Sequence, residues 1–326
     1  MRWIDAETTR AALPFSRLIP ALRERFISGC EVPLRHVHPI HQVQAAQGAG
    51  GEPVTSLLMP AWQTGGHYGV KIVNIAPGNA ARGLPGLHSS YLLHDAATGV
   101  PLALIDGDQI TARRTAAASA LAASFLACSH ARSLLVVGAG RVAALLPEAY
   151  RAVRAIDRVT VWARQPAAAD ALALAWRDQG FDATAAPDLA AAVACADIVS
   201  CATLATAPVV LGRWLRPGSH LDLIGSFTPA MRETDDDCLR GATLFIDTDE
   251  ALAKSGDLLG PMSRGVFQAS DVAARLDQLC SGQHPGRREA AERTVFKSVG
   301  TALEDLAAAS LVFNEVAASK DRRRAD

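Results

Sequence analysis

Short apolar runs alternate with alanine-rich stretches from about residue 114 onward. Such runs are typical of strands buried on both faces, and the stretches between the first three have helical composition. Strands that alternate with helices are typical of a parallel sheet. The pattern therefore predicts an α/β protein whose second half is a doubly wound, Rossmann-type sheet. The predicted strands are Ser133–Val137, Arg158–Ala163, Asp197–Cys201, His220–Gly225 and Thr243–Asp247.

The first part of the chain differs, because its short apolar segments are mixed with Pro, Gly and His. Within it, Gln42–Pro53 is typical of a surface loop or hairpin tip. Near the end, Arg287–Ser319 has apolar residues at helical spacing, which predicts one long helix that returns to pack on the first domain. We predict a smaller α+β domain of residues 1–113 with 295–326, and a Rossmann domain of residues 114–294.

Composition and charge narrow the class of protein. The chain has 326 residues, 49% hydrophobic and 20% charged, with a formal net charge of -1. The length and composition suit two globular domains. The near-zero net charge argues against a nucleic-acid partner, because proteins that bind nucleic acid usually carry a basic face. Acids at Asp5 and Glu7 stand where a signal peptide has its apolar core, and no apolar run reaches membrane-spanning length, so we expect a cytoplasmic protein without a membrane partner. Six cysteines lack paired metal-ligand spacing, so we expect reduced thiols and no metal site.

A glycine-rich turn follows the first predicted strand. The residues Gly138, Ala139, Gly140, Arg141 and Val142, with a small residue next, fit the pattern G-x-G-x-x-A between a strand and a helix. In that pattern the first glycine turns the chain, the second lets the backbone approach a pyrophosphate, and the helix N-terminus faces the phosphates. Such turns also occur for packing alone. The second strand about twenty residues later favours dinucleotide binding.

The end of that second strand indicates which dinucleotide is bound. An NAD enzyme usually has Asp or Glu there to hold the ribose 2′-hydroxyl, whereas an Arg accommodates a 2′-phosphate. Here no acid is present and Arg164 stands in that region. This favours NADPH, with NADH as the alternative, unless Arg164 is an ordinary solvated side chain.

Three basic residues of the first half have unusual surroundings. Lys71 lies in a predicted strand, where alternation puts it on the same face as Gly69 and Val73. Arg114 begins a helix of small residues, and Arg35 follows a proline and a leucine. Each is either a pocket residue or part of a structural ion pair or charged surface.

Together these features resemble the ornithine cyclodeaminase/mu-crystallin family over nearly the whole chain. That family includes ornithine cyclodeaminases, an alanine dehydrogenase and ketimine reductases that reduce cyclic imines. The resemblance implies a homodimer in which the first domain forms the dimer interface and the substrate floor. It is carried by Leu58–Ala61, Gly69–Lys71, Pro77–Asn79, Gly83–Pro85, Asp95–Pro101, Thr111–Ala117, Gly138–Gly140, Thr294–Gly300 and Leu303–Asp305.

The resemblance also implies roles for the three basic residues. Lys71 matches the family's active-site lysine, Arg114 its carboxylate-binding arginine, and Arg35 a second such arginine. The residue types suit these roles, because Arg grips a carboxylate bidentately and a poorly hydrated lysine has a depressed pKa that permits proton exchange near neutrality. Hydroxyls at Thr203, Ser226 and Ser298 are candidate cofactor contacts, with turn or cap roles as the equal alternative.

One departure from the family pattern bears on the reaction. Ornithine cyclodeaminases carry an Asp after the fourth Rossmann strand, where this sequence has Phe227. Phenylalanine neither pairs with an ammonium nor accepts a proton, but it lines a pocket for an apolar ring. We therefore expect NAD(P)H-dependent reduction of a cyclic ketimine carboxylate to a cyclic L-amino acid such as L-proline or L-pipecolate. The alternatives are ornithine cyclodeamination and a non-catalytic protein that binds NADPH and small ligands.

Overall fold

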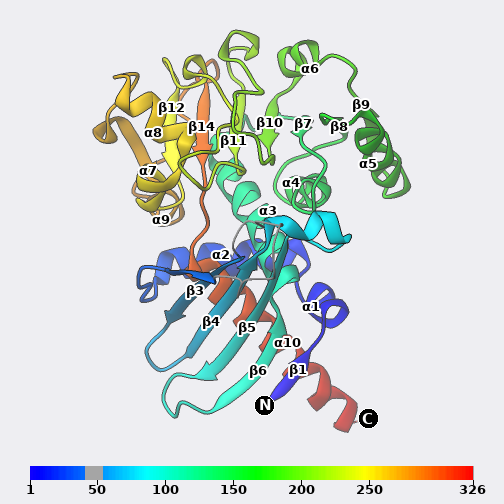
Figure 1. Ribbon diagram of the computed structural model, residues 1–326, viewed down its shortest axis with the longest axis vertical. Helices are drawn as coiled ribbons and strands as arrows, with labels where there is room; N and C mark the ends of the chain where they lie inside the picture. The colour runs from blue at the N-terminus through cyan, green and yellow to red at the C-terminus, as the bar shows by residue number, and fades with distance from the viewer. Residues whose placement is uncertain (41–53, 326) are drawn as a thin grey trace, which may run out of the picture. The chain divides into compact units, whose positions relative to one another are not determined.

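The computed structural model describes residues 1–40 and 54–325 and divides into two compact units (Figure 1). Unit 1 comprises Met1–Arg114 with Thr301–Asp326, and unit 2 comprises Thr115–Gly300. The predicted loop at Gln42–Pro53 lies outside the described residues.

Unit 2 is built on a parallel sheet of eight strands in the order β13-β12-β14-β11-β10-β7-β8-β9. The predicted Rossmann-type α/β class is therefore confirmed, and the five predicted strands correspond to β7, β8, β10, β11 and β12. The strands are β7 (Ser133–Val137), β8 (Arg158–Trp162), β9 (Asp182–Ala185), β10 (Ile198–Cys201), β11 (His220–Leu223), β12 (Thr243–Ile246), β13 (Val272–Arg275) and β14 (Thr294–Lys297).

Helices connect these strands, and apolar side chains of the sheet form the core beneath them. Leu135, Val199 and Leu221, on three neighbouring strands, are almost wholly inaccessible to solvent. The helices are α4 (Leu146–Arg151), α5 (Pro166–Asp178), α6 (Leu189–Cys195), α7 (Glu250–Lys254), α8 (Gly256–Ser263) and α9 (Leu276–Cys280), with α3 (Gly107–Leu126) running into unit 2 from unit 1.

The predicted long helix Arg287–Ser319 is wrong over its first half. Thr294–Lys297 forms β14, fully buried between β11 and β12, and the helix α10 runs from Ala302 to Ala325. The β-branched and aromatic residues of β14 suit a central strand. Gly300 has a φ of 76°, a left-handed backbone conformation that separates β14 from the helix. The strands β9 and β13 were not predicted, because their short, alanine-containing segments lack a strong apolar signal.

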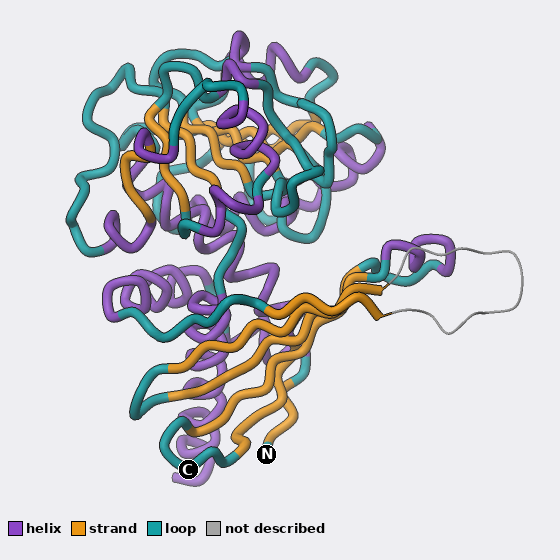
Figure 2. The backbone as a smooth tube through the Cα atoms, turned by 60° about the vertical axis from the view of Figure 1, so that its left-hand side comes forward, coloured by secondary structure: helices purple, strands orange, loops and turns teal. Residues whose placement is uncertain are grey.

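Unit 1 contains a six-stranded sheet in the order β1-β6-β5-β4-β3-β2 (Figure 2). β1 is parallel to β6, and the other neighbours are antiparallel. The strands are β1 (Arg2–Ile4), β2 (His36–Ile40), β3 (Val54–Trp62), β4 (His67–Ile75), β5 (Leu87–Asp95) and β6 (Pro101–Asp106).

One face of this sheet is covered by α10, which also packs against α1 (Ala6–Ala12) and α2 (Phe15–Ser28). The strand register aligns Met59, Lys71, Tyr91, Ile105 and Ile4 in a row across the sheet, and all five are buried. Lys71 is therefore the one charged side chain among these five.

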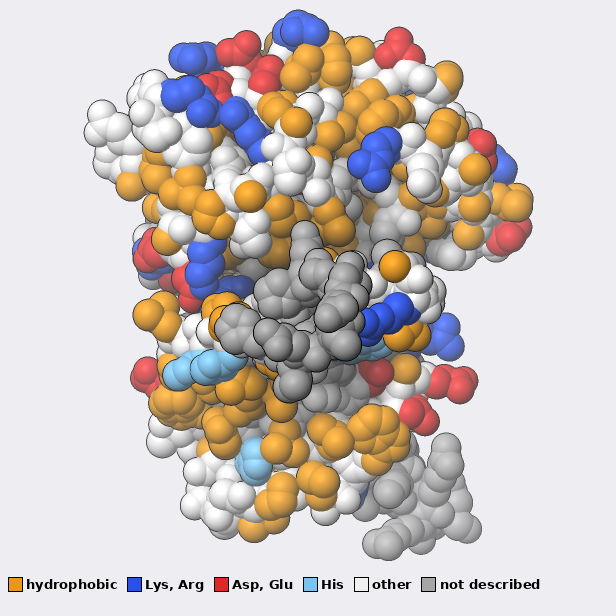
Figure 3. All heavy atoms as spheres, viewed as in Figure 1, with side chains coloured by type: hydrophobic (Ala, Val, Ile, Leu, Met, Phe, Trp, Pro, Cys, Tyr) orange, Lys and Arg blue, Asp and Glu red, His pale blue; other side chains and the backbone are white. Residues whose placement is uncertain are grey.

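The opposite face of the sheet is only half-buried. Val70 and Ile72 on β4, and Leu92 on β5, point to this face and retain access to solvent. Figure 3 shows apolar side chains gathered over these strands. Among the described residues, no helix combines the length and the apolar character needed to cross a bilayer.

The first prediction concerns Gly69, which lies under the ring of Tyr91. A Cβ atom at Gly69 would lie 2.3 Å from the Tyr91 hydroxyl oxygen. We expect Gly69→Ala to lower the free energy of unfolding by about 1–3 kcal/mol, because the buried ring must shift. Urea unfolding checks this, with Gly78→Ala as control, since a Cβ at Gly78 would meet no atom within 4 Å. Equal effects of the two substitutions would contradict the prediction.

Candidate active site

The glycine-rich turn lies where the strand order of unit 2 reverses. β7 has β8 on one side and β10 on the other. The chain adds β8 and β9 on the first side of β7 and then crosses to add β10 and β11 on the second. Open α/β sheets bind ligands at such a switch point, outside the carboxyl ends of the strands. Gly138 has a φ of 119°, and a Cβ there would lie 2.6 Å from the carbonyl oxygen of Ala202 after β10. This position therefore requires glycine.

Gly140 leaves room for a ligand beside the backbone. A Cβ at Gly140 would meet no atom within 4 Å, and Ala139, Gly140 and Arg141 are exposed, whereas Val142 is half-buried. The residues after the motif form a 3-10 turn, Ala143–Leu145, before the six-residue helix α4. The expected helix thus begins later and is shorter than the motif predicts. The space at Gly140 nevertheless fits a group that approaches the backbone closely.

Arg164 stands two residues beyond the end of β8, beside the glycine-rich turn on the same edge of the sheet. Its side chain is exposed. The end of β8 carries no acid, as the sequence indicates.

A buried carboxylate joins the loops that follow β10 and β11. Glu233 accepts hydrogen bonds from the Thr203 amide (2.7 Å) and hydroxyl (2.8 Å), and from the Gly225 amide (2.7 Å). The Ser226 hydroxyl is buried and donates to the carbonyl of Met231 at 2.7 Å. The hydroxyls of Thr203 and Ser226 therefore form hydrogen bonds that hold these loops together.

Two further predicted residues complete this edge. Ser298 follows β14, is almost fully buried and donates its amide to the carbonyl of Leu223 at 3.1 Å. Phe227 lies on the loop after β11 and is 37% exposed, which is unusual for a large apolar side chain. Phe227 is thus available to contact a ligand.

In unit 1, Lys71 and Arg114 meet at one carboxylate. The Lys71 Nζ donates to Asp305 Oδ1 at 2.8 Å and lies 2.7 Å from Oδ2, while Arg114 Nε donates to Oδ1 at 2.9 Å. Arg114 Nη1 also donates to Glu304 Oε2 at 2.6 Å. All four side chains are buried. The structure therefore brings the two principal predicted residues together on the first turn of α10.

Burial controls the protonation of this cluster. It lowers the pKa of Lys71 to about 8, with Asp305 opposing the shift and Arg114 adding to it. For Asp305, burial alone would raise the pKa, but Lys71 and Arg114 outweigh it and lower the pKa. Lys71 is thus a buried amine whose pKa is lowered toward neutral pH, in the direction the sequence predicts.

The neighbouring arginine has a different role. Arg113 donates from Nε to the carbonyl of Leu13 at 2.7 Å and lies over the ring of Phe15. Consecutive helical residues point in different directions, so Arg113 anchors the N-terminal helices while Arg114 faces the acids.

Arg35 directly precedes β2, and its side chain is half-buried. The register that pairs His36 with Leu58 puts Arg35 at the level of Met59, whose partner on β4 is Lys71. Arg35 therefore stands at the end of the row that contains Lys71.

Asp305, Glu304 and Glu233 were given no role from the sequence alone. A signal for the first two was present, since Thr301 and Glu304 have the Thr-x-x-Glu spacing of a helix start. The Thr301 hydroxyl does accept from the Leu303 amide at 3.3 Å. The Glu304 carboxylate, however, is engaged by Arg114.

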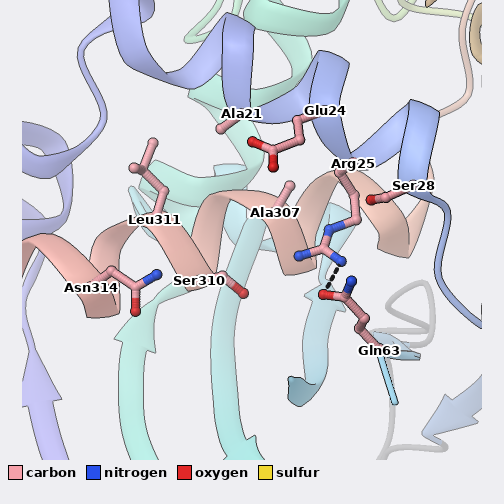
Figure 4. A pocket seen from close by; sticks show the side chains of 9 residues that line it. All are labelled: Ala21, Glu24, Arg25, Ser28, Gln63, Ala307, Ser310, Leu311 and Asn314. Carbon is pink, nitrogen blue, oxygen red and sulfur yellow. Dashed lines mark hydrogen bonds between the residues drawn. The ribbon is translucent and has the colours of Figure 1, made fainter. Parts of the chain in front are cut away.

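A separate cavity of about 330 Å³ lies between α2 and α10 (Figure 4). Arg25 and Glu24 reach into it from α2, and Arg25 donates to the side chain of Gln63. Neither Lys71 nor Arg114 lines this cavity, so it is distinct from the cluster at Asp305.

Comparison with known proteins gives consistent results. The family model described as the ornithine cyclodeaminase/mu-crystallin family matches residues 53–320. A Δ1-pyrroline-2-carboxylate reductase of Paracoccus denitrificans is 43% identical over 282 residues, which cover 86% of this chain and 89% of that protein.

Two solved structures are similar along almost the whole chain. The Δ1-pyrroline-2-carboxylate reductase of Thermococcus litoralis, in complex with NADH and L-proline, has a TM-score of 0.91 and 30% identity and covers 98% of both chains. An archaeal alanine dehydrogenase dimer with bound NAD has a TM-score of 0.89 and 27% identity over 98% of this chain and 97% of that chain.

The second prediction concerns Asp305. We expect Asp305→Asn to lower the free energy of unfolding by about 3–5 kcal/mol, because Lys71 and Arg114 would remain buried with less compensation. The pKa of Lys71 should fall below about 8, since the carboxylate that raises it is gone. Urea unfolding and an NMR titration of labelled lysine measure the two effects. Asp157→Asn, which breaks the exposed pair with Arg132, should change neither appreciably, and an unshifted Lys71 pKa in Asp305→Asn would refute the prediction.

Proposed function

Because the chain belongs to the ornithine cyclodeaminase/mu-crystallin family, we propose that it reduces a cyclic ketimine carboxylate to a cyclic L-amino acid with NADH or NADPH. The substrate would be Δ1-pyrroline-2-carboxylate or Δ1-piperideine-2-carboxylate, giving L-proline or L-pipecolate. The reductase relatives support this reaction. The observation that carries it is the buried pairing of Lys71 and Arg114 on Asp305.

Arg114 is the proposed carboxylate-binding residue. Its guanidinium has five N–H donors, of which one on Nε and one on Nη1 are directed at Asp305 and Glu304. The acids thereby fix the plane of the guanidinium and leave its remaining donors for a substrate carboxylate. A fixed planar fork orients the carboxylate, and with it the adjacent C=N carbon. Arg35 is proposed as a second contact to the same group.

Lys71 is the proposed proton donor to the ring nitrogen. Its pKa of about 8 keeps much of the amine protonated at neutral pH, yet makes loss of the proton easy. A protonated C=N bond is a stronger hydride acceptor than a neutral one. After donation, Asp305 still accepts a hydrogen bond from the neutral amine.

The dinucleotide would be held along the carboxyl edge of the unit 2 sheet. Gly138–Val142 would cradle the pyrophosphate, Arg164 the ribose, and the loops that carry Thr203, Ser226 and Ser298 the other half of the molecule. When bound, the cofactor supplies the hydride that reduces the C=N carbon. Gly140, with open space beside it, supports this fit.

Phe227 favours reduction over ornithine cyclodeamination. Its half-exposed ring offers an apolar surface to a ring substrate and no carboxylate for an amine. Release of ammonia from ornithine without net cofactor consumption would establish the cyclodeaminase instead. Binding of NADPH without turnover of any imine would indicate a non-catalytic binding protein.

We also propose that the protein is a homodimer. The half-buried apolar face of the unit 1 sheet, seen in Figure 3, is the kind of surface that a second copy covers. An alanine dehydrogenase of similar structure is a dimer.

The third prediction tests the reaction and the substrate grip together. We expect oxidation of NADH or NADPH in the presence of pyrroline- or piperideine-2-carboxylate, and no ammonia release from ornithine. Arg114→Lys should lower kcat/KM at least about tenfold although it keeps the charge, because an ammonium cannot reproduce the planar fork. Arg82→Lys, on an exposed 3-10 turn, is the matched control. Near-normal kcat/KM in Arg114→Lys would show that Arg114 is structural.

The fourth prediction concerns the choice of cofactor. If Arg164 contacts a 2′-phosphate, the wild type should bind NADPH more tightly than NADH, and Arg164→Ala should erode that preference. Kd values for both cofactors, measured by their fluorescence, check this, with Arg158→Ala at the amino end of the same strand as control. A wild type that binds NADH as tightly as NADPH would disprove the role of Arg164.

A further inference from the structure

Three carboxylates are buried near a single lysine at the carboxyl edge of the unit 2 sheet. Lys297 ends β14 and is fully buried, and its Nζ lies 3.9 Å from Asp257 Oδ2. Neither of these two atoms has a hydrogen-bond partner among the described residues. The other two carboxylates, Glu233 and Asp247, are equally buried.

Lys297 is the cation that these groups share. Burial raises the pKa of Glu233 to about 7, and the Lys297 ammonium opposes the shift. Burial also raises the pKa of Asp247, again with Lys297 opposing. With all groups ionised, the three carboxylates and one ammonium leave an excess of two negative charges.

This cluster is built into the loops at the edge of the sheet. Glu233 holds the Thr203 and Gly225 amides, and its own amide donates to Asp257 Oδ1 at 2.9 Å. Asp247 accepts from the amides of Val299 and Gly300, both at 2.7 Å. The charges therefore lie directly behind the loops after β10, β11 and β14.

Those loops belong to one half of the dinucleotide site. In a doubly wound sheet, each half of the strands serves one mononucleotide, and the two halves meet at the switch point beside β7. The pyrophosphate turn and Arg164 follow β7 and β8, which leaves the loops after β10, β11 and β14 for the nicotinamide half. The nicotinamide has an oxidised and a reduced form, and only the oxidised ring carries a positive charge.

We propose that the buried Glu233, Asp257 and Lys297 form an electrostatic positioning network that favours the oxidised, cationic nicotinamide over the reduced, neutral one. This inference rests on the proposed function, because it requires a nicotinamide dinucleotide at this edge. The excess negative charge lowers the free energy of the positive ring and so favours departure of the hydride. Lys297 limits that excess.

The experiment measures Kd for NAD⁺ and NADH at pH 8, where the carboxylates are largely ionised. Lys297→Met removes the cation and should shift the ratio of the two Kd values toward NAD⁺ by about five- to tenfold, the size of typical coupling between sites. Glu233→Gln removes a carboxylate and should shift the ratio toward NADH by a similar factor. Asp257→Asn should shift the ratio in the same direction as Glu233→Gln. It replaces Glu233→Gln in the experiment if that variant does not fold.

A matched control lies at the opposite edge of the same sheet. Asp197 accepts hydrogen bonds from the Arg132 and Ser133 amides, both at 2.9 Å, before the start of β10. Asp197→Asn should destabilise the fold and leave the ratio unchanged. Loss of structure alone weakens both dinucleotides together, so the ratio separates an electrostatic role from a structural one.

The outcomes distinguish this inference from the proposed function. If the wild type binds both dinucleotides and the ratio is constant in all variants, or moves in one direction for both charge types, the inference is overturned and the function stands. If the wild type binds only the phosphorylated dinucleotides, the same ratio is measured with NADP⁺ and NADPH. If it binds neither NAD(H) nor NADP(H), the proposed function fails and the inference fails with it.

Discussion

Unit 1 depends on the carboxylate of Asp305. Its oxygens bind the ammonium of Lys71 from β4 and the guanidinium of Arg114 from α3, so one side chain joins the C-terminal helix to the sheet and to the helix that leaves it. Two cations buried together repel each other and lose their hydration, and neither cost is tolerable without a paired anion. The contact that ties these elements of unit 1 together is therefore also the contact that orients Arg114 and limits how far burial lowers the pKa of Lys71.

Unit 2 also uses a buried carboxylate, at the carboxyl edge of its sheet. There a carboxylate, Glu233, holds backbone amides of two loops, and a Cβ at Gly225 would lie 2.0 Å from the carbonyl oxygen of Thr203. The loops are therefore fixed by buried charge and by close backbone approach. Hydroxyls such as that of Ser226 are turned inward to the same network. Side chains that remain exposed at this edge include Arg141, Arg164 and Phe227.

The sequence predicted the parts of this molecule that local pattern controls. Strands β7 and β8 were identified from apolar runs, and alternation placed Lys71 on the same face of its strand as Gly69 and Val73, which is the buried face of β4. The strand β14 was missed because a short central strand and a helix share an apolar pattern, and the choice depends on neighbours far away in the chain. Asp305 and Glu233 were missed for a related reason. An acid at a helix start or in a loop looks solvated until the fold shows the cation or the amides that it meets.

Charge balance at Asp305 links substrate binding to proton transfer. Lys71 and Arg114 contribute two positive charges, and Glu304 and Asp305 contribute two negative charges, so the buried cluster is formally neutral. A ketimine carboxylate with a neutral ring nitrogen would bring an uncompensated negative charge into this poorly hydrated region. The same substrate with a protonated nitrogen adds no net charge. In the proposed reaction, charge balance thus favours a substrate that enters with its nitrogen already protonated, which is the form that accepts hydride. A proton that Lys71 passes to a neutral ring nitrogen moves charge within the site without changing its total, and a lysine with a pKa of about 8 is suited to that transfer.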